Sequence, residues 1–419
     1  MTLLPDTPAA TSRPLRVAYF FRRGRGVRLE QWRLGQGPDE MLYGLNHLDP
    51  ERHQPWFLEG GQADRDWRRG LWKPVEKVIS RRVGMGFVLH LAWGHLEALR
   101  QSDVIVATVD ACGLPVAELK LRGLLDTPLI YVSQGLSYRL AAMRPGIPGR
   151  EWFRRHYARL LGAAERVLVL GQGAAEPLER ELGLEPGRVG FLPFGVDERF
   201  WTPAAPDGGT GDYLLSVGSD PARDHDTLLR AVKGVRLKLV TRLGVPSDRR
   251  WPGCEVESRF SDLELRELYR RARLVIIPLK DVAQPSGQSA TLQAMACGRP
   301  VVLNRTRGLW EPARLIHGDN CWLVEPGDAS GLRRAVDTIL ADPDLAASLG
   351  ARARRSVEMG NTSRKMAQDL AGHIQAALGQ GRPARQRSST HPNKEERPSA
   401  RARFSWSSGS SCAYARNTG

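Results

Sequence analysis

Short apolar runs recur along the whole chain, and stretches with helical character lie between them. Each run is bounded by polar or turn residues, as is typical of strands that are covered on both faces of a parallel sheet. In the first half the predicted strands are Arg16–Phe21, Val104–Ala107, Leu129–Val132, Val167–Leu170 and Val189–Leu192. In the second half they are Tyr213–Val217, Leu237–Val240, Leu274–Pro278, Val301–Leu303 and Trp322–Val324. This alternation predicts an α/β protein with two doubly wound, Rossmann-like domains that face each other across a cleft.

A segment punctuated by proline and glycine divides the two halves between Gly195 and Gly211. The expected parts are a flexible N-terminus over 1–14, a first domain over 15–200, a second domain over 201–378 and a disordered basic tail over 379–419. The last helical pattern, about Thr362 to Leu378, either stays with the second domain or crosses back to the first. The tail is rich in Arg, Ser and Pro and has too few apolar residues to form a core.

Composition narrows the class of protein. The 419 residues suit two domains, and 41% hydrophobic and 26% charged residues are typical of a globular chain. No apolar run approaches the roughly 20 residues of a membrane span, and the start does not resemble a secretory signal. We therefore expect a cytoplasmic protein, with a location at the inner face of the membrane left open. The five scattered cysteines match neither a disulfide framework nor a zinc site, so we expect reduced, mostly buried thiols.

The positive charge is unevenly distributed. The net charge is +15, and the segment 380–419 contains eight Lys/Arg and two Glu, which leaves +6 in the tail and +9 in the remainder. A positive surface attracts nucleic acid, phosphorylated substrates or an anionic membrane. Charge alone does not choose among these partners.

The most informative segment is Leu274–Leu303. A strand leads through a loop with Ser286 and Gly287 into a helix that is predicted to begin near Gln288 and to end at Cys297. Gly298 then suits the left-handed position that follows a helix. A small-residue loop before a helix offers free backbone N–H groups at the positive end of the helix dipole, and such a site binds phosphate. The alternative is an ordinary strand-to-helix turn that binds nothing.

Four motifs in this chain resemble those of the retaining GT-B glycosyltransferases, specifically the large family 4 of sucrose synthase and bacterial cell-envelope transferases. They are Gln293–Val302, Leu192–Asp197, Tyr213–Gly218 with Leu228–Ala231, and Asn320–Val324 with Pro326–Asp328. The resemblance extends from about Val167 to Val357 and is only topological before that. It implies a GT-B fold, a nucleotide-sugar donor in the second domain and an acceptor on the side of the first.

The donor site departs from the family pattern. In the family, two glutamates with seven residues between them contact the ribose and the sugar, whereas here Gln293 and Pro285 hold these positions. Either a polar subgroup uses glutamine and serine instead, or the donor site has changed its function. Under the first interpretation, the donor-binding residues are Ser286, Gly287, Gln288, Ser289, Gln293, Gly218 and Ser219, and Gln284 is a further candidate.

Two catalytic candidates are also implied by the resemblance. The family places an Arg and a Lys on the diphosphate after the first strand of the second domain, and in this chain Arg223 is the strong cation of that loop. Its alternative role is a surface arginine paired with Asp220 or Asp224. The family also places a His-Gly pair after a strand of the first domain, where this chain has Gln134-Gly135. Gln134 can form hydrogen bonds but cannot act as a general acid or base.

Basic segments of the first domain are candidates for acceptor or membrane contact. The glycine-rich turn Arg22–Gly26 follows the first strand, and a helix is expected around Glu40–Leu48. The predicted helix Glu151–Leu161 combines arginines with Trp152, Phe153 and Tyr157. It either lies on an anionic membrane or turns its aromatic side chains inward while the arginines stay in water.

We therefore predict transfer of a sugar from a UDP- or GDP-sugar to a carbohydrate or lipid-linked acceptor, with retention of configuration, in cell-envelope or exopolysaccharide biosynthesis. Neither a cofactor nor a metal is expected, and the partners are the donor, the acceptor and, as an option, a membrane. The alternatives are a catalytically silent GT-B protein that binds a sugar nucleotide or a partner enzyme, and a UDP-sugar epimerase. A nucleic-acid partner is disfavoured because it rests on the basic tail alone.

Overall fold

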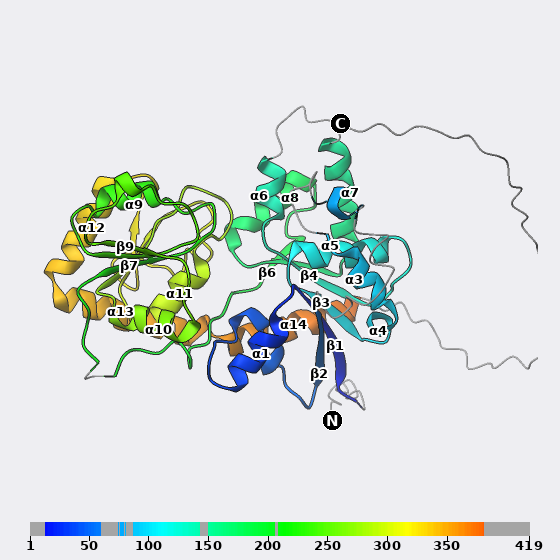
Figure 1. Cartoon of the computed structure of the whole chain (residues 1–419). Coiled ribbons are helices and arrows are strands. Elements are labelled where there is room, and N and C mark those ends of the chain that lie inside the picture. The colour runs from blue at the N-terminus through cyan, green and yellow to red at the C-terminus, as the bar shows by residue number, and fades with distance from the viewer. Residues whose placement is uncertain are drawn as a thin grey trace, which may run out of the picture. The chain divides into compact units, whose positions relative to one another are not determined.

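The computed structural model describes residues 13–59, 74, 76–78, 80, 87–142, 150–205 and 208–380. Two parallel sheets of six strands form its framework (Figure 1). The first sheet has the order β2-β1-β3-β4-β5-β6 and the second the order β12-β11-β10-β7-β8-β9. The strands of the first sheet are β1 (Leu15–Phe21), β2 (His53–Glu59), β3 (Val104–Ala107), β4 (Leu129–Ser133), β5 (Arg166–Val169) and β6 (Val189–Phe191). Those of the second are β7 (Leu214–Val217), β8 (Leu237–Val240), β9 (Cys254–Glu257), β10 (Leu274–Ile277), β11 (Val301–Asn304) and β12 (Trp322–Val324).

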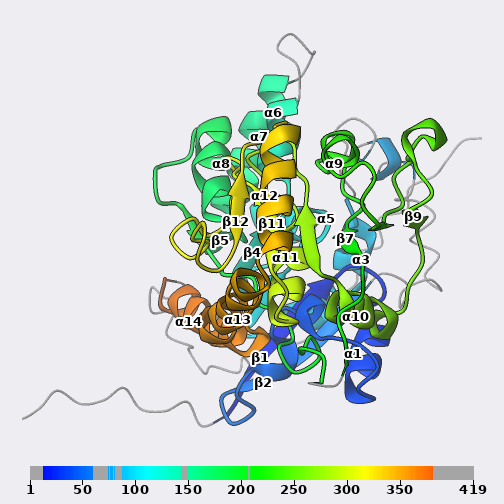
Figure 2. The same ribbon diagram turned by 90° about the vertical axis from the view of Figure 1, so that its left-hand side faces the viewer.

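Helices connect successive strands and cover both faces of each sheet, as Figures 1 and 2 show from two sides. The helices of the first half are α1 (Arg25–Arg33), α3 (Leu89–Gly94), α4 (Leu96–Arg100), α5 (Asp110–Leu121), α6 (Leu136–Ala142), α7 (Arg150–Gly162) and α8 (Ala175–Leu182). Those of the second half are α9 (His225–Ala231), α10 (Asp262–Arg271), α11 (Gln288–Ala296), α12 (Ala329–Ala341), α13 (Pro343–Gly360) and α14 (Ser363–Gln380). Short 3-10 turns are η1 (Glu40–Leu42), η2 (Leu45–His47), η3 (Gln172–Ala174) and η4 (Ser247–Arg249). The predicted doubly wound α/β fold is confirmed.

The second sheet reverses its direction of winding between two central strands. From β7 the chain proceeds outward to β8 and β9, and then returns to β10 on the other side of β7 before it continues to β11 and β12. In such sheets the loops that leave the two central strands diverge at the carboxyl edge and open a crevice in which ligands bind. The loops after β7 and β10 therefore flank the place where a ligand of this half is expected.

Two strands were missed by the sequence prediction, and both lie at an edge of a sheet. β2 is the outermost strand of the first sheet and contains Pro55, and β9 is the outermost strand of the second. Each contains only one or two buried residues among partly or fully exposed ones. An edge strand has one open side, where polar residues and proline are tolerated, so it lacks the continuous apolar run by which the inner strands were found.

The predicted helix around Glu40–Leu48 is wrong. Instead, two 3-10 turns are separated by Tyr43 and Gly44, which both have positive φ, 51° and 77°. A Cβ at Gly44 would lie 2.7 Å from the Cα of Ala367 in α14. The close approach of a distant helix thus requires glycine at position 44, and the left-handed backbone of Tyr43 and Gly44 interrupts a regular helix.

The described residues up to Gln380 form one compact unit. One buried cluster contains residues from both sheets, including Tyr19 of β1, Ile277 of β10 and Trp201 of the connecting segment. Helix α14 contacts β4 and η2, so the last helix lies against the first half of the chain. The described cysteines, Cys112, Cys254, Cys297 and Cys321, are free and buried, as predicted. No helix among the described residues has the length and apolar character needed to cross a membrane.

Residues 1–12 of the N-terminus predicted over 1–14, and residues 381–419 of the tail predicted over 379–419, with Cys412, lie outside the described residues.

Gly113 of α5 allows that helix to lie directly on the ring of Tyr131, because a Cβ there would be 2.1 Å from the ring. We expect Gly113→Ala to lower the free energy of unfolding by about 1–3 kcal/mol through overpacking. Gly372→Ala is the matched control, because Gly372 lies in α14 and a Cβ added to it would meet nothing within 4 Å. It should raise the melting temperature, since alanine favours a helix. Thermal unfolding measures both, and a neutral Gly113→Ala would contradict this account.

Candidate functional site

The loops after β7 and β10 meet around one arginine. Gly218 directly follows β7 with φ 151°, and a Cβ on it would lie 2.1 Å from Nε of Arg223. Gly287 is the N-cap of α11 with φ 75°, and a Cβ on it would lie 3.3 Å from Nη1 of the same arginine. Two glycines thus leave the space that the guanidinium occupies, at the crevice where the sheet changes direction.

The Arg223 side chain is buried and incompletely paired. The residue is 5% exposed, and its nearest carboxylate oxygen, on Asp220, lies 3.6 Å from Nε. Nε and Nη1 have no hydrogen-bond partner among the described residues. Burial lowers the pKa of Arg223, against the attraction of Asp220. A buried cation with free donors is costly, so this site favours an anion. Of the alternative considered from the sequence, the surface position is wrong, whereas the ion pair with Asp220 is present.

The amino terminus of α11 adds to this positive site. The helix runs from Gln288 to Ala296, and Gly287 offers no side chain to cap it. No side chain at Gly287 therefore caps the backbone N–H groups of the first turn, to which Ser289 belongs. The predicted helix start and the left-handed Gly298, with φ 69°, are confirmed. Cation and helix dipole act together here, which is the arrangement that phosphate requires.

Other predicted donor residues use their side chains within the protein. The Ser286 hydroxyl donates to Oδ2 of Asp220 at 2.7 Å, and the Ser219 hydroxyl accepts from the backbone N–H of Arg242 at 2.9 Å. Nε2 of Gln288 donates to the carbonyl of Leu170, which follows β5 of the first sheet, at 2.8 Å. Each of these three side chains supports a loop through one hydrogen bond and keeps further donor or acceptor capacity.

Gln293 lies further along α11 and is bonded on both sides. Its Nε2 donates to Oε1 of Glu40 at 2.9 Å, and its Oε1 accepts from the hydroxyl of Tyr269 at 3.3 Å. Glu40 also accepts from Nε1 of Trp201 at 3.1 Å and from the backbone N–H of Asp197 at 3.4 Å. The amide is thus the link between the second half of the chain and a buried carboxylate of the first.

Sequence reasoning missed Glu40. The residue is 2% exposed, and burial raises its pKa to about 7, with a further contribution from the charges of Asp39 and Asp197. Burial likewise raises the pKa of Asp197 to about 6. The partners of Glu40 lie more than 150 positions away in the sequence, so no local pattern identified it.

In the first half, the predicted residue Gln134 is held inside its own domain. Its Nε2 donates to the hydroxyl of Tyr43 at 2.6 Å and to the carbonyl of Thr108 at 2.5 Å. Its backbone N–H donates to Oδ1 of Asp110 at 3.3 Å, a buried carboxylate that also accepts from the hydroxyl of Ser133. Both amide hydrogens of Gln134 are therefore used to fix the end of β4.

Gly135 faces the loop that precedes α11. A Cβ placed on Gly135 would lie 3.6 Å from Oε1 of Gln284 and 3.9 Å from Oδ2 of Asp110. Oxygen acceptors from both halves of the chain therefore surround the same position. The basic turn Arg22–Gly26 lies after β1, but α1 already begins within it, and the backbone N–H groups of Arg25 and Gly26 donate to Glu59.

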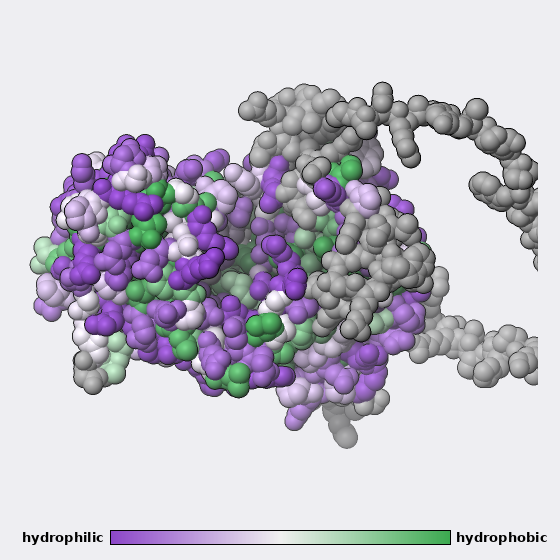
Figure 3. All heavy atoms as spheres, in the orientation of Figure 1, coloured by the Kyte–Doolittle hydropathy of each residue, from purple (hydrophilic) through white to green (hydrophobic). Residues whose placement is uncertain are grey.

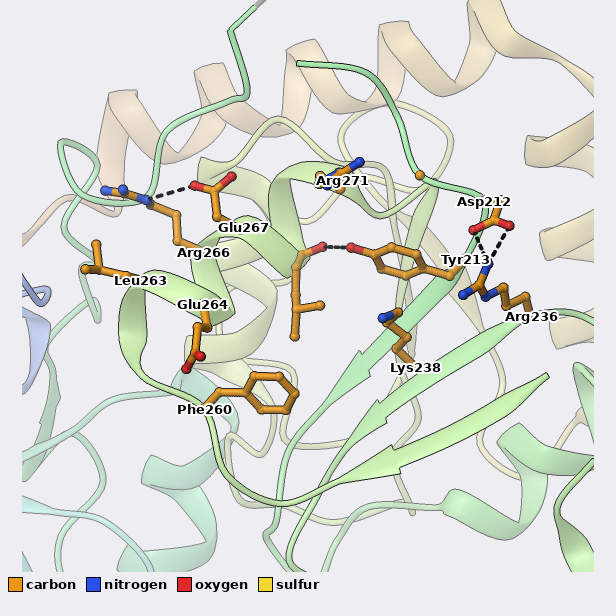
Figure 4. A pocket seen from close by; sticks show the side chains of 12 residues that line it. Asp212, Tyr213, Arg236, Lys238, Phe260, Leu263, Glu264, Arg266, Glu267 and Arg271 are labelled. Atoms are coloured by element: carbon orange, nitrogen blue, oxygen red, sulfur yellow. Dashed lines mark hydrogen bonds and ion pairs between the residues drawn. The ribbon is translucent and has the colours of Figure 1, made fainter. Parts of the chain in front are cut away.

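Two cavities of the second half adjoin each other and share Phe260 and Glu264 in their linings. One, of about 520 Å³, is lined at the carboxyl edge by Arg242, Ser258, Arg259, Phe260, Ser261 and Glu264. The other, of about 710 Å³, lies between α10 and the amino ends of β7 and β8, where Tyr213, Arg236 and Lys238 line it (Figure 4). None of the predicted donor residues lines the second cavity. The first cavity is linked to the site by the hydrogen bond from the backbone N–H of Arg242 to the hydroxyl of Ser219.

The raised pKa of Glu40 predicts a pH dependence of stability. Its ordinary pKa is 4.5 and its folded pKa is about 7, so the folded state binds more protons than the unfolded state between these values. Stability should fall as the pH rises through this range, by roughly 2 kcal/mol between pH 5 and pH 8 from this group. Glu40→Gln should remove this part of the slope. Urea denaturation of both proteins at several pH values measures it, and equal slopes would contradict the assignment.

Comparison with known proteins agrees with the architecture. Residues 212–342 match the family described as glycosyl transferases group 1. The chain is 41% identical over 66 residues to N-acetyl-alpha-D-glucosaminyl L-malate synthase of Bacillus anthracis, over 16% of this chain and 17% of that protein. It is 27% identical over 239 residues to D-inositol 3-phosphate glycosyltransferase of Streptomyces bingchenggensis (strain BCW-1), over 48% of this chain and 50% of that protein. These matches span half or less of the curated relatives' length.

Solved structures resemble the whole described chain. Anabaena HepE in complex with UDP-glucose has a TM-score of 0.61 at 14% identity, and the match covers 86% of this chain and 100% of the HepE chain. Sucrose-phosphate synthase from Thermosynechococcus elongatus has a TM-score of 0.62 at 18% identity, over 87% of this chain and 100% of that chain. The protein therefore has the GT-B fold, and its second half is similar in sequence to the glycosyl transferases of group 1.

Proposed function

We propose that this protein is a glycosyltransferase that moves a sugar from a nucleoside-diphosphate sugar to a carbohydrate or lipid-linked acceptor. The observation that carries the proposal is the buried guanidinium of Arg223, with two nitrogens that lack a hydrogen-bond partner among the described residues, between Gly218 and Gly287. A diphosphate supplies the anion that this site lacks. The sequence match over 212–342 covers these same residues.

Breaking the glycosidic bond of such a donor leaves negative charge on the departing diphosphate. Donors that are already in place stabilise this charge without reorganisation, and they are worth most in a buried site. Arg223 adds its buried positive charge beside Gly287, and α11 offers the N–H groups of its first turn. The base would extend along the carboxyl edge toward Arg242 and Phe260, which line the adjacent cavity.

We assign the donor's sugar and the acceptor substrate to the space next to Gly135. Oδ2 of Asp110 and Oε1 of Gln284 flank it, and both are acceptors that suit sugar hydroxyl groups. Gln134 holds the backbone of this position and takes no part in proton transfer. Retention of configuration is proposed because a substitution assisted by the leaving phosphate needs no protein nucleophile. We place the chain in a polar subgroup of family 4, with Gln293 in place of the acidic residue.

A donor screen tests the proposal. The purified protein is incubated with UDP-glucose, UDP-GlcNAc and GDP-mannose, and both binding and slow release of the nucleotide are measured. The complex of HepE with UDP-glucose makes a UDP-sugar the first candidate. Binding with release supports a working transferase. Binding without release, even with cell-envelope acceptors, favours the catalytically silent alternative, and the absence of any binding would overturn the site.

Because Arg223 is buried and incompletely paired, its replacement should lower nucleotide affinity without lowering the melting temperature. In Arg223→Met the buried charge is replaced by an apolar chain, so the melting temperature should stay equal or rise, while nucleotide affinity falls at least about tenfold.

Arg354→Met is the matched control. Arg354 donates to the carbonyls of Trp201, Ala296 and Glu198 at 2.7, 2.7 and 3.0 Å. Its removal should lower the melting temperature and leave affinity unchanged. Calorimetric titration and thermal unfolding give both values, and a strongly destabilised Arg223→Met with intact affinity would refute the role.

Contact with a membrane surface is proposed for α7. Tyr157 of this helix is buried, whereas Trp152 is 56% exposed and the Arg155 side chain is 75% exposed. An exposed tryptophan beside arginine suits an anionic interface. The coloured part of the face shown in Figure 3 is mainly hydrophilic, with small, scattered hydrophobic groups.

Trp152→Ala should reduce co-sedimentation with vesicles that contain anionic lipid. Ile316→Ala is the control, since Ile316 is also exposed, at 51%, but lies in the second half of the chain. Equal binding of the wild type and both variants would contradict a role for α7, and so would a wild type that does not sediment with the vesicles.

A further inference from the structure

A third cavity of the second half, of about 390 Å³, lies at the amino ends of β10 and β11, where Arg273, Arg299 and Pro300 line it. Its volume is within the range of small-molecule sites, roughly 300–1,000 Å³. Helix α11 begins beside Arg223 and ends just before Gly298, which also lines this cavity. The nine residues of that helix span roughly 13–14 Å. The cavity is therefore distinct from the proposed donor site.

The charge in this cavity is positive. Among the described residues that line it, Arg273 and Arg299 are the only charged ones, and neither forms an ion pair with a described carboxylate. Nη1 of Arg299 donates to the carbonyl of Ala272 at 3.3 Å, whereas its Nε is buried without a partner. Nη2 of Arg273 donates to the carbonyl of Leu340 at 3.5 Å. A guanidinium has five N–H donors, so both arginines keep donors for an anion.

The rest of the wall is mainly apolar and is formed by the end of α12 and the start of α13. Its members are Ile339, Leu340, Pro343, Ala346 and Ala347. Asp342 lies between the two helices, but it caps α13 by accepting from the backbone N–H of Leu345 at 2.9 Å and does not line the cavity. None of the large, exposed hydrophobic side chains of the described surface lines it either. The apolar surface is therefore recessed.

The larger cavity shown in Figure 4 has a different balance of charge. There Arg236 pairs with Asp212 at 2.7 Å, and Glu264 and Glu267 share the lining. An anion in that cavity would meet carboxylates. The cavity beside α12 and α13 instead combines two arginines with apolar surface, so it suits a molecule that has a negative charge at one end and an apolar chain at the other.

We propose that this cavity binds a small amphipathic anion, with a carboxylate or phosphate head on Arg273 and Arg299 and a short aliphatic chain against α12 and α13. Guanidinium groups bind such heads through pairs of N–H donors, and each methylene that leaves water adds to the affinity. The recessed wall favours a free molecule over a membrane surface, because membrane contact requires apolar side chains that reach into the lipid. The site goes beyond the proposed function and does not depend on it.

Calorimetric titration of the full-length chain with octanoate at neutral pH tests the site. Affinity should rise about tenfold for each two methylenes from butanoate through hexanoate to octanoate, because the chain leaves water along the apolar wall. Octanol has the same chain without the charge and should bind at least about tenfold more weakly than octanoate. An affinity that ignores chain length or charge would contradict an amphipathic site.

Substitutions separate the head from the chain. Arg299→Met and Arg273→Met should each weaken octanoate binding about tenfold and leave octanol binding unchanged, because only the charged donors are lost. Arg273 is exposed, so its variant should fold normally and keeps the test valid if Arg299→Met is unstable. Ala346→Phe should weaken the binding of both ligands, since the larger side chain fills the cavity.

Arg333→Met is the matched control. Arg333 lies on α12 and removes the same charge when it is replaced, but it does not line the cavity and pairs with Asp337 at 2.8 Å. Octanoate should bind this variant as tightly as the wild type. A similar loss of affinity in Arg333→Met would reveal a general effect of net charge and would refute a local site.

The remaining outcomes are decisive as well. Octanoate binding that requires both arginines and the free space beside Ala346 supports the inference. Equal octanoate affinities of the wild type, Arg299→Met and Arg273→Met would place the ligand elsewhere and overturn it. The inference is also wrong if octanoate does not bind the wild type while anionic vesicles sediment with the wild type and not with Arg299→Met, because the arginines then serve a membrane surface.

Discussion

The buried charge of Arg223 is the constraint around which the second half of the chain is built. An arginine with one carboxylate oxygen 3.6 Å away and two nitrogens without a hydrogen-bond partner in the described structure does not stabilise a fold. The protein nevertheless holds it between two backbone positions, Gly218 and Gly287, that only glycine can occupy without a clash or strain. An arrangement that costs stability and demands glycine twice is explained by what it binds rather than by what it stabilises.

Topology explains why these residues meet. Gly218 and Gly287 are far apart in sequence, but the strands before them, β7 and β10, are neighbours where the sheet reverses its winding. Their loops must diverge there, so the crevice is a consequence of strand order and does not depend on particular side chains. The first sheet has the same type of reversal between β1 and β3, and Asp110 follows the end of β3 by three positions.

The sequence predicted those features that local patterns encode. Buried strands such as β3 and β10 are continuous apolar runs, and the start of α11 is indicated by its small-residue loop, so both were found with bounds close to the observed ones. Edge strands and the turns around Gly44 were missed, because their conformation is set by packing against residues distant in sequence. The same reason applies to the site. Arg223 could be chosen as a candidate because it is the strong cation of a short loop, but its burial follows only from the glycines around it.

Glu40 shows most clearly what a sequence motif omits. In the family pattern, Gln293 replaces an acidic residue, and the sequence left two interpretations open, a polar subgroup and an altered donor site. The structure places the carboxylate of Glu40 2.9 Å from Nε2 of that glutamine, so acid and amide together occupy the region where the pattern has one side chain. Whether a glycosyltransferase motif is intact is therefore a question about the acceptors and donors gathered in space, and a residue-by-residue comparison along one helix does not answer it.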